Sequence, residues 1–159
     1  MNQSPLIITV SSADASAKLA GNLGLLLRPG DSILFFGPIG AGKTHICRHL
    51  IQSLLNIPED VPSPTFTLVQ TYDTRSGEIW HADLYRLSDP DELQELGLSD
   101  AFHSAICLIE WPDRLGDNAP PDALHLTIEP DPMREDTRHI TFDWVNPKWT
   151  DRLAGLQHD

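Results

Sequence analysis

The sequence has 159 residues, with 11 lysines and arginines against 23 aspartates and glutamates, and a formal net charge of -12 at pH 7. A chain of this length is expected to form one domain, residues 1–159, that buries a core without disulfides or metals. The acidic balance argues against direct binding of a polyanion, because affinity for nucleic acid comes largely from cationic side chains that neutralise phosphates.

The cysteines and the N-terminal segment bear on the compartment. Cys47 and Cys107 fall within apolar patterns and predict buried free thiols, not a disulfide framework or a cysteine zinc site. The first residues show no basic leader followed by an apolar stretch, and no run is long enough to span a bilayer. We therefore expect a cytoplasmic protein without membrane contact.

The first third of the chain predicts a helix, a strand and a second helix. Apolar residues recur at helical spacing from Ser12 to Leu26, and a turn at residues 28–31 follows. Residues 32–36 form a continuous apolar run, which is typical of a strand buried on both faces. After Gly42 the helical spacing resumes. This order of strand, glycine loop and helix is the one that a phosphate-binding loop requires.

The middle of the chain predicts a β-hairpin and a short helix. Residues 65–72 and 78–84 are interpreted as strands around a polar turn, so an antiparallel pair is expected in an otherwise parallel sheet. Asp89 followed by Pro90 at the first helical position is typical of a helix start. We expect this helix to end near Gly97.

The last third predicts three more strands and a helix. Residues 105–109 form a second buried apolar run, residues 124–128 and 139–144 are interpreted as later strands, and Asn146 with Pro147 opens the last helix. The pattern as a whole predicts an α/β fold with a mixed central sheet flanked by helices.

The glycine loop carries the most specific chemical signal. Residues 37–44 are GPIGAGKT and match the pattern GxxxxGK[ST]. Its glycines allow backbone N–H groups to wrap a phosphate, and the following helix directs its positive dipole end at the anion. Lys43 is predicted to reach the β- and γ-phosphates, and Thr44 to ligate the magnesium ion that bridges them. With both flanking elements in place, a P-loop NTPase is favoured over a chance glycine-rich turn.

A P-loop requires an acidic residue at the end of another buried strand, where it holds magnesium or orients water. Glu110 ends the run Ile-Cys-Leu-Ile-Glu and is our candidate for this role and for a magnesium ligand. The alternative for Glu110 is a solvated charge. Trp111 either stacks near the nucleotide or packs against the fold, as aromatic residues after a strand often do.

Two further residues are candidates for the catalytic site. Thr65 lies where many NTPases carry a switch segment whose hydroxyl senses the γ-phosphate through magnesium. From the residues alone, the alternative is an ordinary proline turn that leads into a strand. Asp83 is expected at the end of the second hairpin strand, where its carboxylate can position the attacking water.

Taken together, these motifs resemble a known family, the bacterial tRNA threonylcarbamoyladenosine biosynthesis ATPase TsaE. Four segments carry the resemblance: GPIGAGKT, SPTFTLVQTY, HADLYRL with the downstream DELQELGLSD, and CLIEWPDRLG. They lie between Gly37 and Gly116, and their order and spacing are similar to the family's throughout.

The resemblance implies an ATPase with ATP and Mg2+ as ligands, which assists the proteins that make the threonylcarbamoyl modification on an adenosine next to the anticodon of certain tRNAs. Its partners would be threonylcarbamoyl transferase proteins of the TsaD and TsaB type, with tRNA reached only through them. Thr65 and Asp83 would be functionally important, and Glu110 with Trp111 would close the site. The P-loop residues assigned to nucleotide are Gly37, Gly40, Ala41, Gly42, Lys43, Thr44 and His45.

The sequence departs from the family pattern in two places. Pro38, Ile39 and His45 replace residues more usual in the loop, which should be harmless. The later glycine-arginine segment contains Met133 and Arg134, which leaves open whether Arg134 or Arg138 contacts the nucleotide or whether both are surface arginines. An adenine contact near Asp14 is an expectation from the resemblance only.

Three other functions fit a P-loop. A small-molecule or nucleoside kinase normally clamps phosphates with an arginine-rich lid, and no such segment is visible. A GTPase is disfavoured because no NKxD-like segment occurs; residues 146–149 lack the acid. A binding module that switches with nucleotide but does not hydrolyse it stays open, since residue types do not distinguish it.

Overall fold

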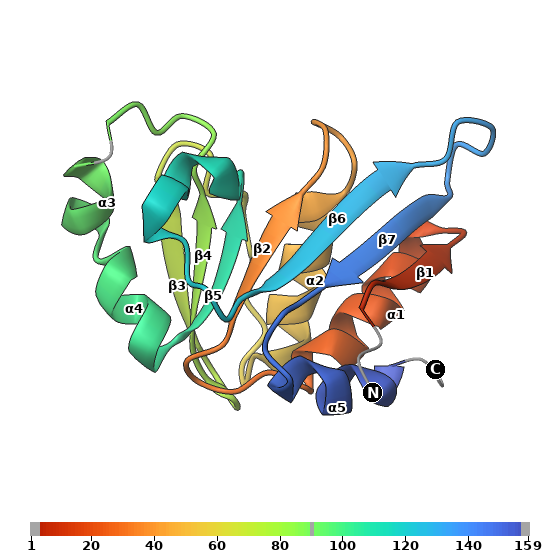
Figure 1. The fold of residues 1–159 in the computed structure, drawn as a ribbon, viewed down its shortest axis with the longest axis horizontal. Helices are drawn as coiled ribbons and strands as arrows, with labels where there is room; N and C mark the ends of the chain where they lie inside the picture. Colours follow the sequence, from red (N-terminus) through yellow and green to blue (C-terminus); the bar gives the residue numbers. More distant parts are fainter. Residues whose placement is uncertain (1–3, 90, 157–159) are drawn as a thin grey trace.

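The computed structural model describes residues 4–89 and 91–156 (Figure 1). Its strands are β1 (Leu6–Val10), β2 (Ser32–Phe36), β3 (Val69–Thr74), β4 (Gly77–Asp83), β5 (Ile106–Glu110), β6 (Leu124–Pro130) and β7 (Arg138–Asp143). Its helices are α1 (Ala13–Gly24), α2 (Lys43–Leu54), α3 (Asp91–Leu96), α4 (Leu98–Ser104), the 3-10 helix η1 (Pro112–Asn118) and α5 (Lys148–Ala154). In the part of the chain that is described, no helix is both long and apolar enough to cross a bilayer.

The described strands form one sheet in the order β1-β7-β6-β2-β5-β4-β3. β2 lies at its centre and pairs in parallel with β5 and β6, and β4 pairs in parallel with β5. Both edges are antiparallel, with β3 beside β4 on one side and β7 between β1 and β6 on the other. The predicted α/β fold with a mixed sheet is therefore confirmed.

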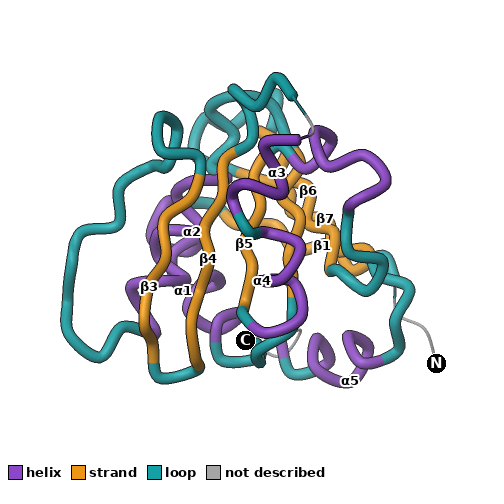
Figure 2. Tube along the Cα trace, turned by 90° about the vertical axis from the view of Figure 1, so that its left-hand side faces the viewer, coloured by secondary structure: helices purple, strands orange, loops and turns teal. Residues whose placement is uncertain are grey.

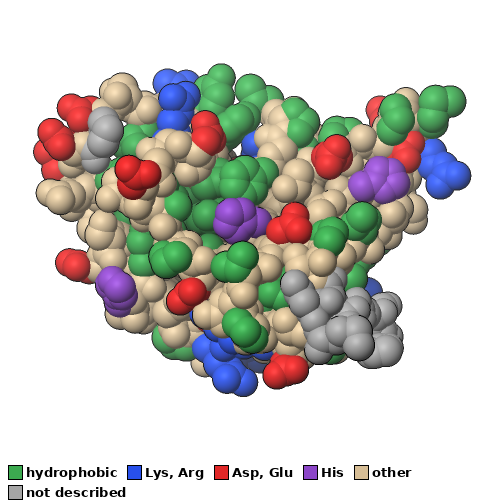
Figure 3. All heavy atoms as spheres, viewed as in Figure 1, with side chains coloured by type: hydrophobic (Ala, Val, Ile, Leu, Met, Phe, Trp, Pro, Cys, Tyr) green, Lys and Arg blue, Asp and Glu red, His purple; other side chains and the backbone are tan. Residues whose placement is uncertain are grey.

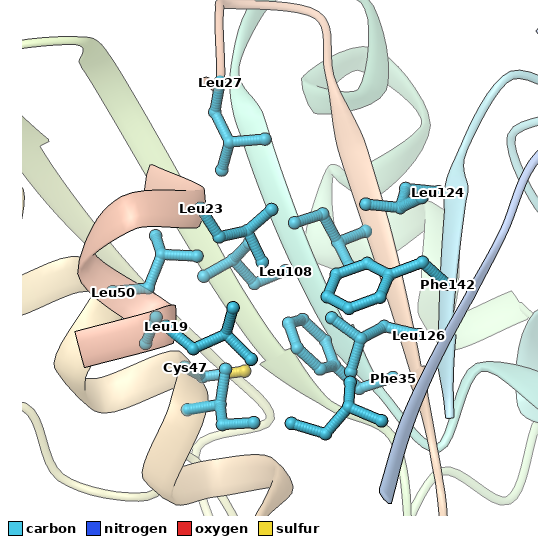
Figure 4. Packing of buried hydrophobic residues seen from close by; sticks show 14 of the residues in the cluster. Leu19, Leu23, Leu27, Phe35, Cys47, Leu50, Leu108, Leu124, Leu126 and Phe142 are labelled. Atoms are coloured by element: carbon cyan, nitrogen blue, oxygen red, sulfur yellow. The ribbon is translucent and has the colours of Figure 1, made fainter. Parts of the chain in front are cut away.

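The sheet is covered on both faces because the side chains of its central strands alternate. Ile33 and Phe35 of β2 belong to the core cluster that includes residues of α1 and α2, whereas Leu34 belongs to the cluster that includes residues of α3 and α4. Figure 1 and Figure 2 show these helix pairs on opposite sides of the central strands. Figure 4 shows Leu19, Leu23 and other apolar side chains of the first cluster in close packing. The continuous apolar run in β2 thus reflects burial on two faces.

The hairpin begins later than the sequence predicts. A strand was expected from Thr65, but β3 starts at Val69. The preceding residues form a turn in which the Leu68 N–H donates to the Pro64 carbonyl at 2.7 Å and Leu68 has a φ of 68°. This left-handed residue ends the turn and frees Thr65 from the sheet.

Other elements agree with the sequence to within a few residues. Ser12 caps α1, since its hydroxyl accepts from the Ala15 N–H at 3.0 Å. The last predicted helix is α5, and its Asn146 side chain accepts from the Lys148 N–H. The expected helix start at Pro90 lies outside the described residues. Strand β1, helix α4 and η1 were not predicted.

Candidate nucleotide-binding site

The loop between β2 and α2 has the backbone that the glycine motif predicts. Gly37, Gly40 and Gly42 have φ angles of 144°, 83° and 110°, a region that other residues rarely adopt. A Cβ atom on Gly37 would lie 2.5 Å from the Ile128 carbonyl oxygen, whereas one on Gly40 or Gly42 would meet nothing within 4 Å. The loop is thus held closely by β6 at its start and borders open space further on. A phosphate fits such a cradle.

Lys43 begins α2 and is almost fully buried. Its Nζ donates to the Gly37 carbonyl at 2.5 Å and lies 3.5 Å from the centroid of the Trp111 ring. Burial lowers the pKa of Lys43, and the nearby carboxylates of Glu110 and Asp83 oppose that shift. No side chain caps the start of α2, whose N–H groups are therefore not covered by a capping group.

Glu110 lies beside the P-loop because β5 is the direct neighbour of β2. Its backbone is in register with Phe35 on one side and Asp83 on the other. The Thr44 hydroxyl donates to Glu110 Oε1 at 2.7 Å. A hydroxyl and a carboxylate are oxygen ligands of the kind that Mg2+ prefers, so Thr44 and Glu110 fit the predicted magnesium site.

Asp83 connects the sheet to the segment that carries Thr65. It ends β4, and its Oδ1 accepts from the Tyr85 N–H at 3.0 Å. Its Oδ2 lies 3.4 Å from the Thr65 hydroxyl, which also contacts the Ser63 hydroxyl at 2.8 Å. A segment expected to sense the γ-phosphate therefore contacts an acid expected to position water.

These side chains line one cavity of about 360 Å³ at the end of the sheet where β2, β4 and β5 terminate. An α/β sheet commonly binds its ligand at this end. The cavity is lined by nine of the residues that were assigned to the site from the sequence: Gly40, Gly42, Lys43, Thr44, His45, Thr65, Asp83, Glu110 and Trp111. Gly37 and Ala41 belong to the same loop but do not line the cavity.

Two assigned residues lie elsewhere. Asp14 lies in the first turn of α1, and Arg134 is exposed in the connection between β6 and β7. Arg138 instead reaches the P-loop, where its Nε donates to the Ala41 carbonyl at 3.0 Å. Arg138 and His45 also border a second cavity of about 220 Å³, which lies between α1, the P-loop and β7.

Sequence reasoning assigned no role to His81 or Tyr85. Strand alternation places His81 on the same face of β4 as Asp83, and the pattern His-Ala-Asp carries that signal. His81 Nε2 lies 2.7 Å from Glu110 Oε2, and both side chains are buried. The Tyr85 ring lies 4.9 Å from the Trp111 ring and lines the first cavity.

A soft-metal site at His81 and Glu110 is disfavoured. Their ligand atoms and the Cys47 sulfur lie within 4.8 Å of one another. His81 Nε2 and Glu110 Oε2 already contact each other at 2.7 Å, however, and Cys47 is a fully buried member of the hydrophobic core. Cys47 is therefore better described as a packed apolar side chain.

Comparison with known proteins decides the family. The family model described as "Threonylcarbamoyl adenosine biosynthesis protein TsaE" matches residues 10–140, which include every element of the site. The chain belongs to the TsaE family. The resemblance seen in its four motifs is thereby confirmed.

Relatives within the TsaE family are similar over most of their length. The tRNA threonylcarbamoyladenosine biosynthesis protein TsaE of Rickettsia felis is 37% identical over 123 residues, which make up 77% of this chain and 72% of the relative. The Bacillus subtilis protein of the same name is 34% identical over 77% of this chain and 75% of its own length. The crystal structure of Bacillus subtilis YdiB aligns with a TM-score of 0.77 and 24% identity over 98% of this chain and 95% of that one, which supports the fold.

Proposed function

We propose that this protein is a Mg2+-dependent ATP-binding and ATP-hydrolysing protein that assists threonylcarbamoyladenosine modification of tRNA in the cytoplasm. It acts together with threonylcarbamoyl transferase proteins of the TsaD and TsaB type. The observation that carries the proposal is the convergence of Lys43, Thr44 and Glu110 on one cavity in a chain of the TsaE family. A bound magnesium ion would neutralise charge on the β- and γ-phosphates.

The residues divide the work between binding and hydrolysis. The P-loop backbone and Lys43 hold the phosphates, and Thr44 with Glu110 provides oxygen ligands. Asp83 faces the same cavity and is free of ion pairs among the described residues, so its carboxylate can orient a water molecule. Trp111 covers the Lys43 ammonium and excludes water from it.

In this proposal the protein reaches transfer RNA only through its partners. The net charge is -12, and on the face seen in Figure 3 the Lys and Arg side chains lie in separate groups. Such a surface releases few counterions from a polyanion. Anisotropy of labelled tRNA should therefore show weak binding to this protein alone at physiological salt, and tight, salt-sensitive binding would contradict the accessory role.

The Thr65 segment is proposed to report the nucleotide state to the partners. Its hydroxyl lines the cavity and is 3.4 Å from Asp83 Oδ2, so Thr65 lies where a change in the bound nucleotide would alter its surroundings. Co-elution with the TsaD- and TsaB-type proteins should be stronger with ATP than with ADP. Thr65→Ala should narrow that difference.

Thr67→Ala is the matched control for Thr65→Ala. It removes a hydroxyl of the same kind from the same segment, but Thr67 is exposed, and among the described residues its hydroxyl accepts only from the Gln70 side chain. Single-turnover ATP hydrolysis with and without partners completes the test. Partner binding that ignores the nucleotide, or phosphate transfer from ATP to a small molecule, would favour the kinase alternative.

A further inference from the structure

His81 occupies an unusual place beside the candidate site. It lies in β4 with no exposed surface, and its Nε2 is 2.7 Å from Glu110 Oε2. The other carboxylate oxygen, Oε1, accepts from the Thr44 hydroxyl at 2.7 Å. Each oxygen of Glu110 therefore has its own partner, and only one of those partners belongs to the P-loop.

The hydrogen-bond inventory fixes the tautomer of His81. Its Nδ1 is buried and has no partner among the described residues. Nδ1 lacks a partner in either tautomer, so the choice rests on Nε2, which lies 2.7 Å from a carboxylate oxygen that only accepts when ionised. The hydrogen therefore resides on Nε2, and His81 donates to Glu110 Oε2.

The backbone of Glu110 is held in place by the sheet, so only its side chain is free to change conformation. β5 is hydrogen-bonded between β2 and β4, and the Leu84 N–H donates to the Glu110 carbonyl at 3.1 Å. A carboxylate on such a fixed backbone can still rotate to present one oxygen or both. The hydrogen bond from His81 occupies Oε2 and leaves Oε1 as the oxygen that can bind a metal ion.

We propose that His81 is a positioning residue that makes Glu110 a one-oxygen ligand and thereby favours Mg2+ over Ca2+ at the nucleotide. This inference rests on the proposed function. Mg2+ requires a compact octahedral shell of single oxygen ligands, whereas Ca2+ readily accepts both oxygens of one carboxylate. His81 acts through Glu110 and does not itself line the cavity.

The test compares ATP affinity in Mg2+ with ATP affinity in Ca2+, measured by calorimetry. His81→Gln retains an N–H donor of similar reach, and His81→Leu removes it. We expect the ratio of ATP affinity in Mg2+ to ATP affinity in Ca2+ to be the same in wild type and His81→Gln. In His81→Leu this ratio should fall about tenfold, as is typical when a group that orients a metal ligand is lost. His103→Leu, at an exposed histidine of α4, is the control and should change nothing.

The outcomes separate this inference from the proposed function. If wild type does not bind ATP with either ion, the proposed function is wrong. If wild type binds and a folded His81→Leu keeps the same preference, or His81→Gln loses it, the role of His81 is wrong. Should His81→Leu fail to fold, long-range proton–nitrogen NMR spectra of wild-type imidazoles decide: a hydrogen on Nε2 of His81 supports the role, and a ring with its hydrogen on Nδ1 alone overturns it.

Discussion

Arg138 in β7 donates from Nε to the carbonyl of Ala41 in the P-loop at 3.0 Å, although the two residues are 97 positions apart. The same side chain also donates from one terminal nitrogen to the Glu135 and Thr137 carbonyls. The bond to Ala41 ties the P-loop to β7, and the other two fix the Arg138 side chain.

Arg138→Ala should weaken ATP binding by about tenfold. The variant loses the charge-assisted hydrogen bond to the P-loop, and such a loss costs roughly 1.4 kcal/mol. Arg134→Ala is the control, since that side chain is exposed and has no hydrogen-bond or ion-pair partner among the described residues. Calorimetry measures both. If Arg134→Ala weakens binding and Arg138→Ala does not, Arg134 is the residue that contacts the nucleotide.

Lys43→Met should abolish tight ATP binding and change how stability depends on pH. Burial lowers the pKa of Lys43 from 10.5 in the folded state, so between the folded value and 10.5 the unfolded chain binds more protons. The contribution of Lys43 to the free energy of unfolding must then rise with pH in that window. Urea unfolding at pH 7.5 and 10.5 should show that the stability of wild type increases relative to that of Lys43→Met, and a constant or shrinking difference would contradict the pKa shift.

Asp31→Asn should destabilise the protein without affecting the site. Asp31 is buried at the start of β2, and its carboxylate pairs with Lys148 at 3.0 Å and with Arg152. Since both cations are partly exposed, we expect a loss of about 2 kcal/mol, less than for a fully buried pair. That corresponds to a fall in Tm of about 4–8 °C in thermal unfolding.

Glu95→Gln, at an exposed position of α3, is the matched control for Asp31→Asn and should leave Tm unchanged. ATP affinity should be equal in wild type and both variants, because Asp31 lies at the opposite end of β2 from the P-loop. Reduced affinity in Asp31→Asn would show that the two ends of β2 are coupled.

Both cysteines should resist thiol reagents in the folded protein. Burial raises the pKa of Cys47 well above its usual value and that of Cys107 to about 12, so little thiolate exists at pH 8 and neither sulfur is accessible. Ellman's reagent should label neither residue quickly before denaturant is added and both afterwards. Rapid labelling of one thiol in the native protein would reveal a local opening.

The sequence predicts those parts of the site that are encoded locally. The P-loop is a contiguous motif between two periodic segments, so its glycines and Lys43 could be assigned directly. Glu110 could be assigned because β5 must lie near β2 in such a fold. The role of His81 depends on a contact across 29 positions, and that of Arg138 on a contact across 97, and no local pattern reveals either partner.

Strand β1 was missed for a related reason. It lies at the edge of the sheet, and its pairing partner β7 lies at the other end of the described chain, so no contiguous motif links the two. Thr65 was placed in a strand because β-branched and apolar residues continue from it without interruption. The left-handed Leu68 that ends the turn has no signal in the sequence, since a leucine rarely adopts that conformation.

The pairing of β1 with β7 also has a consequence for synthesis on the ribosome. Thr9 and His139 contact each other at 3.0 Å across 130 positions, so β1 has no neighbour in the sheet until almost the whole chain has been made. At about 5–20 residues per second that interval is roughly 7–26 s. Throughout it, the nascent chain exposes an unpaired strand, and closure of this edge must come late in folding, when chaperones have had the longest opportunity to bind it.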